Sequence, residues 1–199
     1  MARTRASDFE EKQHGILTSA AAVFAEQGME KASMAQIASH CRVSKALLYH
    51  YYPSKDELIF AIIHTHLLEL EGSLAAALDE ALAPEDQLRV LVRTVLEKYR
   101  GADDAHRVQL IGTTALSEAQ HGQIRDVERQ IVRHFSQVLR AIHPDLDRPD
   151  RPLLMPVTMS LFGMMNWVYM WFRDGGQITR EDYAEVATTL ILEGVKAVR

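Results

Sequence analysis

Hydrogen-bond donors are concentrated in the segment VSKALLYHYYPSKDEL, residues 43–58. Lys45 and Lys55 lie near its two ends, and three tyrosines and a histidine occupy residues 49–52. Ammonium groups, phenol hydroxyls and imidazole nitrogens can all donate hydrogen bonds to phosphate oxygens. These residue types therefore indicate binding to phosphate groups rather than the making or breaking of covalent bonds.

The chain is acidic overall but basic around this segment. Its net charge of −5 over 199 residues argues, taken alone, against a nucleic-acid partner. From residue 31 to residue 55, however, every charged side chain is basic: Lys31, Arg42, Lys45 and Lys55. Because local charge rather than total charge sets the attraction to phosphate, this window favours a nucleic-acid partner.

Three serines stand where helices can begin. Ser33 and Ser54 each start a capping-box pattern, and Ser44 can cap a helix between them. The helices that these signals predict cover about 34–41, about 45–51 and a longer stretch from residue 55. Two short helices joined by a turn and followed by a long helix form a helix-turn-helix, here over about 33–52.

A helix-turn-helix places its second helix in the major groove of DNA. Lys45 and Ala46, at the start of that helix, are then placed near the bases, and the tyrosine hydroxyls and flanking lysines near phosphates. The residues expected to contact DNA are Ser33, Arg42, Ser44, Lys45, Ala46, Tyr49, His50, Tyr51 and Lys55. Tyr52 is expected in the small core with Phe24. The alternative is that this aromatic turn is only half-buried packing.

Helical periodicity continues along the rest of the chain, and strand signals are nearly absent. Further helices are expected over about 8–27, 55–82, 85–100, 103–119, 121–142, 153–173 and 180–198. The fold class is therefore all-α, with about nine helices. We expect a DNA-binding domain over residues 1–66 and a ligand-binding and dimerisation domain over residues 67–199. The proline-rich stretch 143–152 is expected to be an exposed loop.

Several classes of protein are not expected. No run of about 18 apolar residues indicates a membrane span, and the N-terminus lacks an apolar signal segment, so a cytoplasmic protein is expected. Cys41 is the one cysteine and allows no disulfide framework. No nucleophile, phosphate-loop or metalloprotease motif is found. His64 and His66 are two residues apart and point away from each other on a helix. We expect no enzyme activity, no metal and no cofactor.

The N-terminal segment closely resembles the DNA-binding domain of the TetR family of bacterial transcriptional repressors. The family pattern is matched by Phe24 to Gly28, by MAQIA at residues 34–38 and by residues 43–58, within a resemblance that covers about residues 9–66. This resemblance implies a homodimer whose two recognition helices bind a palindromic operator in double-stranded DNA. It also implies that a ligand in the C-terminal domain releases the DNA. The rival possibilities are a DNA-binding protein without an inducer and a small helical enzyme.

The helix predicted over about 153–173 is apolar on nearly all sides, so it is expected to be buried all round. Its candidate ligand-binding residues are Met159, Phe162, Met165, Asn166, Trp167, Met170, Trp171 and Arg173. A central helix of a dimerisation bundle is an equal alternative, with Asn166 bonded to a neighbouring helix and Arg173 solvated.

The pattern G-M-x-N-W-x-x-x-W in this helix looks like a TetR subgroup that regulates fatty-acid, aromatic-acid or steroid catabolism. Several of these look-alikes respond to acyl-CoA thioesters. The resemblance implies a small hydrophobic or acyl-CoA-like effector, and the alternative is another hydrophobic or drug-like ligand.

Overall fold

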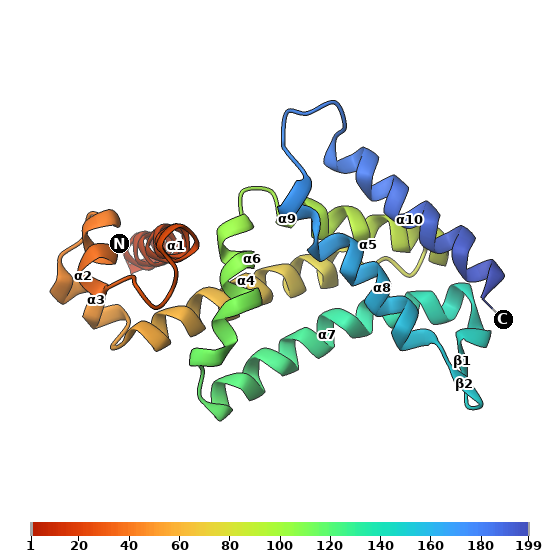
Figure 1. Cartoon of the computed structure of the whole chain (residues 1–199), viewed down its shortest axis with the longest axis horizontal. Coiled ribbons are helices and arrows are strands. Elements are labelled where there is room, and N and C mark those ends of the chain that lie inside the picture. Colours follow the sequence, from red (N-terminus) through yellow and green to blue (C-terminus); the bar gives the residue numbers. More distant parts are fainter. Residues whose placement is uncertain (1, 199) are drawn as a thin grey trace. The chain divides into compact units, whose positions relative to one another are not determined.

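The computed structural model describes the backbone of residues 2–198 and the side chains of residues 11–114 and 116–198. Helices dominate it (Figure 1). In chain order the elements are α1 (Ala2–Gln27), α2 (Met34–His40), α3 (Lys45–Tyr51), α4 (Lys55–Ala77), α5 (Pro84–Lys98), α6 (Asp103–Gly112), α7 (Glu118–Ile142), β1 (Asp147–Arg148), β2 (Arg151–Pro152), α8 (Leu154–Asn166), α9 (Val168–Trp171) and α10 (Arg180–Ala197), with 3₁₀ turns at Thr113–Ala115 and Pro144–Leu146.

The all-α prediction is confirmed. Within the described residues, all the α-helices except the four-residue α9 have seven residues or more. Among the described residues, the one departure from the all-α class is the small hairpin β1–β2, where an exposed loop was expected. Its two-residue strands pair Asp147 with Pro152 and Arg148 with Arg151. An ion pair of 2.7 Å between the Arg148 guanidinium and the Asp150 carboxylate lies at its turn.

The chain divides into two compact units, and α4 and α7 each contribute to both. The first unit contains the described residues up to Leu68 together with Gly101–Asp126. Within it α1 packs against α2 and α6, and α2 packs against α3. Its fully buried apolar side chains include Phe24, Ile37, Leu48, Leu58 and Ile63. Tyr52 is also buried there, as expected, and this core holds the two short helices against the start of α4.

The second unit contains Glu69–Arg100 and the described residues from Val127 onward. Here α10 packs against α5 and α8. Its core includes Leu88, Leu91, Phe135, Leu161 and Met165, none of which is exposed. The functional border predicted between residues 66 and 67 stays a prediction, since compact units and functional domains need not have the same boundaries.

One helix of the described residues, α4, is long and apolar enough to cross a membrane by length and composition alone. It contains no unbroken run of about 18 apolar residues, because Glu57, Glu69 and Glu71 interrupt it. The apolar side chains of α4 are used inside the protein, because Leu58, Ile59, Ile62 and Ile63 are all buried in the first unit. The composition of α4 thus follows from its place in a core.

Candidate functional site

The short helices α2 and α3 are fixed by the caps that the sequence predicts. The Ser33 hydroxyl accepts from the Gln36 amide, and the Gln36 side chain accepts from the Ser33 backbone N–H at 2.9 Å, which completes a capping box. The Ser44 hydroxyl accepts from the Leu47 amide at 3.1 Å and begins α3. Both hydroxyls are therefore committed to capping, and any contact of Ser33 or Ser44 with DNA is made in addition to it.

The turn between α2 and α3 is closed by Arg42. This residue has a φ of 54°, the left-handed conformation that is usually taken by glycine at the end of a helix. Its N–H donates to the Ser39 carbonyl at 3.1 Å, and the next N–H, of Val43, donates to the Ala38 carbonyl at 3.0 Å. This pair of bonds is a Schellman motif, and it sets the direction in which α3 leaves α2.

The side chains predicted to contact DNA are mostly free to do so. Arg42, Lys45, Ala46, Tyr49 and His50 are all exposed. The Lys45 ammonium lies 5.8 Å from the centre of the Tyr49 ring, so the positive charge and the phenol occupy one face of α3. Tyr51 is half-buried, and its ring lies against those of His50 and Tyr52. The exposed set is the chemistry that a groove-reading helix requires.

Lys55 differs from the other members of this set. Its ammonium donates to the carbonyls of Met29, Glu30 and Ala32 at 2.7, 3.2 and 3.3 Å, and the side chain is half-buried. In this structure it therefore binds the turn between α1 and α2 instead of extending into solvent. The sequence does not reveal this contact, because the three carbonyls precede Lys55 by more than twenty residues.

The single cysteine supports no reactive role. Cys41 caps the end of α2 and is partly exposed, and its thiol donates to the Ile16 carbonyl at 3.7 Å. Burial raises the pKa of this thiol, which disfavours the thiolate form. Among the described residues no group of three His, Cys, Asp or Glu side chains is arranged to hold a metal ion.

The residues predicted to bind a ligand divide into three groups in the second unit. Phe162 and Met165 are buried, and the Phe162 ring lies edge-on to Phe135 with 5.0 Å between centres. The Asn166 side-chain oxygen accepts from the Tyr99 hydroxyl at 2.9 Å. Tyr99 is at the end of α5, so this is the bond to a neighbouring helix that the alternative to ligand binding predicted for Asn166. Burial strongly raises the pKa of Tyr99, so its hydroxyl stays protonated and can donate this bond.

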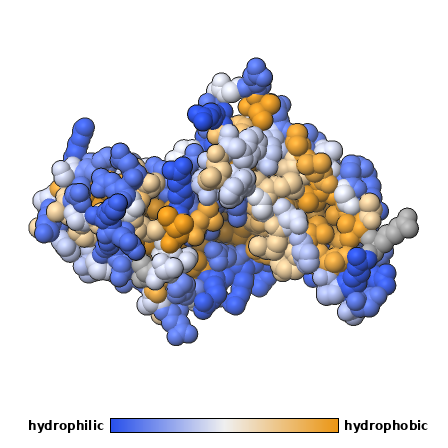
Figure 2. Space-filling view, viewed as in Figure 1, coloured by the Kyte–Doolittle hydropathy of each residue, from blue (hydrophilic) through white to orange (hydrophobic). Residues whose placement is uncertain are grey.

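The remaining members of that set lie on the surface: Met159, Trp167, Met170, Trp171 and Arg173. The expectation of a helix buried all round is therefore wrong for the single chain. The helix also breaks, because α8 ends at Asn166 and Trp167 is a turn residue before α9. Figure 2 shows a broad apolar area over the part of the molecule where α8 and α10 lie in Figure 1.

Two groups of interior polar residues were not predicted. Arg180 is 5% exposed, and its guanidinium makes two bonds to the Asp174 carboxylate, at 3.0 and 2.8 Å, and one to the Leu96 carbonyl at 3.2 Å. Arg180 thereby ties the loop before α10 to α5. In the first unit, His66 and His106 are buried with ring centres 6.1 Å apart. The sequence gives no signal for the bond from Arg180 to Leu96 or for the contact of His66 with His106, because each joins helices that are far apart in the chain.

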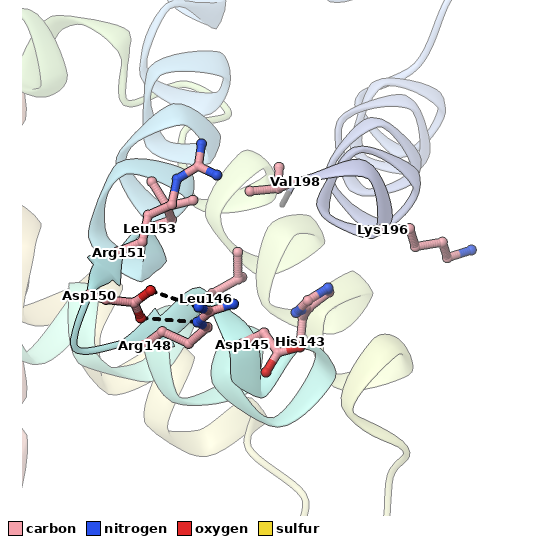
Figure 3. Close-up of a pocket in the computed structure, with 9 residues that line it drawn as sticks. All are labelled: His143, Asp145, Leu146, Arg148, Asp150, Arg151, Leu153, Lys196 and Val198. Atoms are coloured by element: carbon pink, nitrogen blue, oxygen red, sulfur yellow. Dashed lines mark hydrogen bonds and ion pairs between the residues drawn. The ribbon is translucent and has the colours of Figure 1, made fainter.

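A cavity of about 570 Å³ lies in the second unit beside the β1–β2 hairpin (Figure 3). Its lining is mixed, with Arg148, Arg151 and Lys196 but also Asp145 and Asp150. Figure 3 shows the guanidinium of Arg148 already paired with Asp150, and Lys196 extending away from the other residues. Basic groups therefore do not converge on one point here. A second cavity, of about 700 Å³, lies in the first unit between residues 27–31, the start of α4 and the end of α6.

Comparison with known proteins agrees with the helix-turn-helix. The family described as "Bacterial regulatory proteins, tetR family" matches residues 16–62, and "Tetracyclin repressor-like, C-terminal domain" matches residues 81–195. The HTH-type transcriptional repressor KstR2 of Mycobacterium tuberculosis (strain ATCC 25618 / H37Rv) is 25% identical over 187 residues, which are 90% of each chain.

Solved structures give the same result. A TetR-family transcriptional regulator from Bordetella parapertussis 12822 has a TM-score of 0.84 at 31% identity, covering 93% of this chain and 96% of that one. The structure of AibR in complex with isovaleryl coenzyme A and operator DNA has a TM-score of 0.75 at 26% identity, covering 90% and 97%. These relatives are transcription factors, which confirms the prediction that the chain is not an enzyme. The chain belongs to the TetR family of bacterial transcriptional regulators.

Proposed function

We propose that this regulator is a cytoplasmic repressor that binds a palindromic operator as a homodimer and leaves it when a small hydrophobic effector binds. The observation that carries this proposal is the capped helix-turn-helix, whose exposed charged side chains between residues 31 and 45 are all basic. Lys45, Ala46 and Tyr49 on α3 would face the major groove, with Arg42 and His50 at its edges. A dimer would need its two α3 helices about 34–36 Å apart, one turn of DNA.

The surface of the second unit supports the dimer. Exposed residues spaced by four form a ridge along α8 and the turn that follows it, which consists of Met155, Met159, Gly163 and Trp167. A second ridge along α10 consists of Val186, Leu190 and Gly194. We call these two rows the apolar ridges. Rows with this spacing interdigitate when two helices pack, and each glycine has open space beside it that allows close approach.

The effector class that we infer is an acyl-CoA thioester of fatty-acid, aromatic or steroid catabolism. AibR, which was solved with isovaleryl coenzyme A, supports the thioester. KstR2, described as a ketosteroid transcriptional regulator, supports only the link to steroids. After the end of α8, the exposed side chains of Trp167 and Met170 offer an apolar surface suited to an acyl group. Methionine, being flexible, suits such an adaptable site.

Two measurements test the proposal together. Fluorescence anisotropy with the DNA upstream of the chain's own gene should give a dissociation constant of about 10⁻⁸ M or tighter, far below that for unrelated DNA. Isothermal titration should then show binding of an acyl-CoA thioester, and the same thioester should release the DNA. Absence of any specific DNA binding would refute the repressor. Binding of an uncharged drug-like compound in place of every thioester would refute the effector class alone.

A further inference from the structure

The ammonium of Lys55 has a structural partner where the sequence predicts a phosphate. Lys55 is the first residue of α4, and its three hydrogen bonds of 2.7, 3.2 and 3.3 Å all go to carbonyls between residues 29 and 32. An ammonium carries three donors and no acceptor, so one group can serve three carbonyls at once. Each bond is charge-assisted and hence stronger than a bond between neutral groups.

These carbonyls belong to the turn that leads from α1 into α2. Helix α1 ends at Gln27, and Gly28 follows with a φ of +83°, which turns the chain out of the helix. The turn has one internal backbone bond, from the Ala32 N–H to the Gly28 carbonyl at 3.1 Å. Ser33, which caps α2, comes directly after it. The contact with Lys55 therefore fixes the entry of the chain into α2 relative to the start of α4.

We propose that Lys55 is a positioning residue for operator binding, which acts by holding the α1–α2 turn on α4 and not by contacting a phosphate. This inference rests on the proposed operator binding. The two short helices α2 and α3 are joined through the rigid turn at Arg42, so a shift at the start of α2 also shifts α3. To reach a phosphate the ammonium would have to leave three carbonyls, and it would gain at most one new charged partner in exchange.

Replacing Lys55 by arginine distinguishes a contact with phosphate from a contact with the α1–α2 turn. A guanidinium keeps the positive charge and binds phosphate at least as well as an ammonium does. Its donors, however, lie in one plane at the end of a longer group, so they cannot converge on three carbonyls that surround a single nitrogen. Lys55→Arg should therefore keep a phosphate contact but lose the turn contact, whereas Lys55→Met removes both and keeps the apolar stem.

The experiment compares operator affinity for the whole 199-residue chain and its variants Lys55→Arg and Lys55→Met at several salt concentrations. If Lys55 positions the turn, both variants lose about tenfold in affinity, the factor that one charge-assisted hydrogen bond represents. The slope of log affinity against log salt stays that of the wild type in both. Lys45→Met is the reference for a direct contact, and it should reduce the slope by about 0.9.

Hydrogen exchange of the free protein gives a second readout that needs no DNA. Amides of residues 28–33 should exchange faster in both Lys55 variants and at the wild-type rate in Lys31→Met, which removes an exposed charge from the same turn. The proposal is overturned if Lys55→Arg binds DNA like the wild type while Lys55→Met flattens the salt slope by about 0.9, or if exchange is unchanged in both. Failure of the wild type to bind DNA would refute the proposed function, and the exchange result would still decide the role of Lys55 in the turn.

Discussion

Arg42 has a backbone conformation that an L-residue with a side chain rarely adopts. A left-handed conformation costs about 1–2 kcal/mol for a residue with a Cβ atom, and glycine avoids this cost. The Schellman motif at the end of α2 requires the conformation, yet the chain has arginine there. If α3 binds the major groove as proposed, the exposed guanidinium of Arg42, in the turn just before α3, would lie near a DNA phosphate. The presence of arginine at a position that favours glycine is therefore consistent with a role in phosphate binding.

Replacement of Arg42 by glycine separates stability from binding. Arg42→Gly removes the strain of the left-handed conformation, which stabilises the fold, but makes the unfolded chain more flexible, which destabilises it. The free energy of unfolding should therefore stay unchanged or rise by at most about 1 kcal/mol. Operator affinity should fall, and the salt slope should decrease by about 0.9, because one phosphate contact is lost. Thermal unfolding and anisotropy at several salt concentrations measure both effects. Arg42→Lys, which keeps a charge, is the matched control, and an unchanged slope in Arg42→Gly would contradict the phosphate contact.

At the scale of helices, the sequence predicts beginnings better than ends. Ser33, Ser44 and Ser54 each accept a hydrogen bond from the backbone N–H three residues later, as expected, because a cap depends on residues close together in the sequence. The ends depend on packing, so α4 stops at Ala77 rather than near residue 82, and the helix expected over 153–173 breaks after Asn166.

Only the local features of the candidate site could be predicted from the sequence. The exposed donors on α3 follow from the pattern around Ser44, because a short helix leaves most of its side chains in solvent. The contact of Lys55 with the α1–α2 turn and the bond from Tyr99 to Asn166 could not be predicted, because each joins helices that only the tertiary fold brings together.

The contact between α4 and α6 should make the protein sensitive to acid. Burial, with a smaller contribution from the neighbouring His106, lowers the pKa of His66 to about 4, against about 6.5 in an unfolded chain. A lowered histidine pKa means that the unfolded state binds the proton more readily. Stability is therefore fully present above pH 6.5 and is lost as the pH falls toward 4, by on the order of 3 kcal/mol.

Urea unfolding at fixed protein concentration between pH 7.5 and 4 measures this loss. His66→Leu should flatten the pH dependence of the free energy of unfolding over that range, since the variant has no proton to gain at this position. His64→Leu is the matched control, because His64 lies on the same helix and is much less buried. An equal pH dependence in the wild type and His66→Leu would show that other groups account for the acid sensitivity.

At the scale of the whole molecule, the sequence could not distinguish residues buried inside the chain from residues that a second copy covers. Both kinds give the apolar composition of α8. In the structure, Leu161 and Met165 are in the core, whereas Met159 and Trp167 are 50% and 59% exposed. An apolar area this extensive is uncommon on a protein that stays monomeric. The apolar ridges on α8 and α10 are therefore the surfaces on which the proposed dimer depends.

A charge placed on one ridge should separate the subunits without unfolding them. Leu190 is 60% exposed on α10, so Leu190→Arg is easily accommodated in a monomer but would bury an unpaired charge in a dimer. We expect the dissociation constant of the dimer to rise by at least about 100-fold, the effect of roughly 3 kcal/mol. Operator affinity should fall with it, because a single α3 can occupy only one half-site, while the helical circular dichroism spectrum should not change.

Analytical ultracentrifugation over a range of concentrations measures the dissociation constant. Leu78→Arg is the matched control, because Leu78 is an exposed leucine of the same unit that lies away from both apolar ridges. A dimer that survives Leu190→Arg but is disrupted by Leu78→Arg would place the interface at the connection between α4 and α5. In that case the apolar ridges would be exposed for another reason, and binding of the effector at the end of α8 would become the better explanation for Trp167 and Met170.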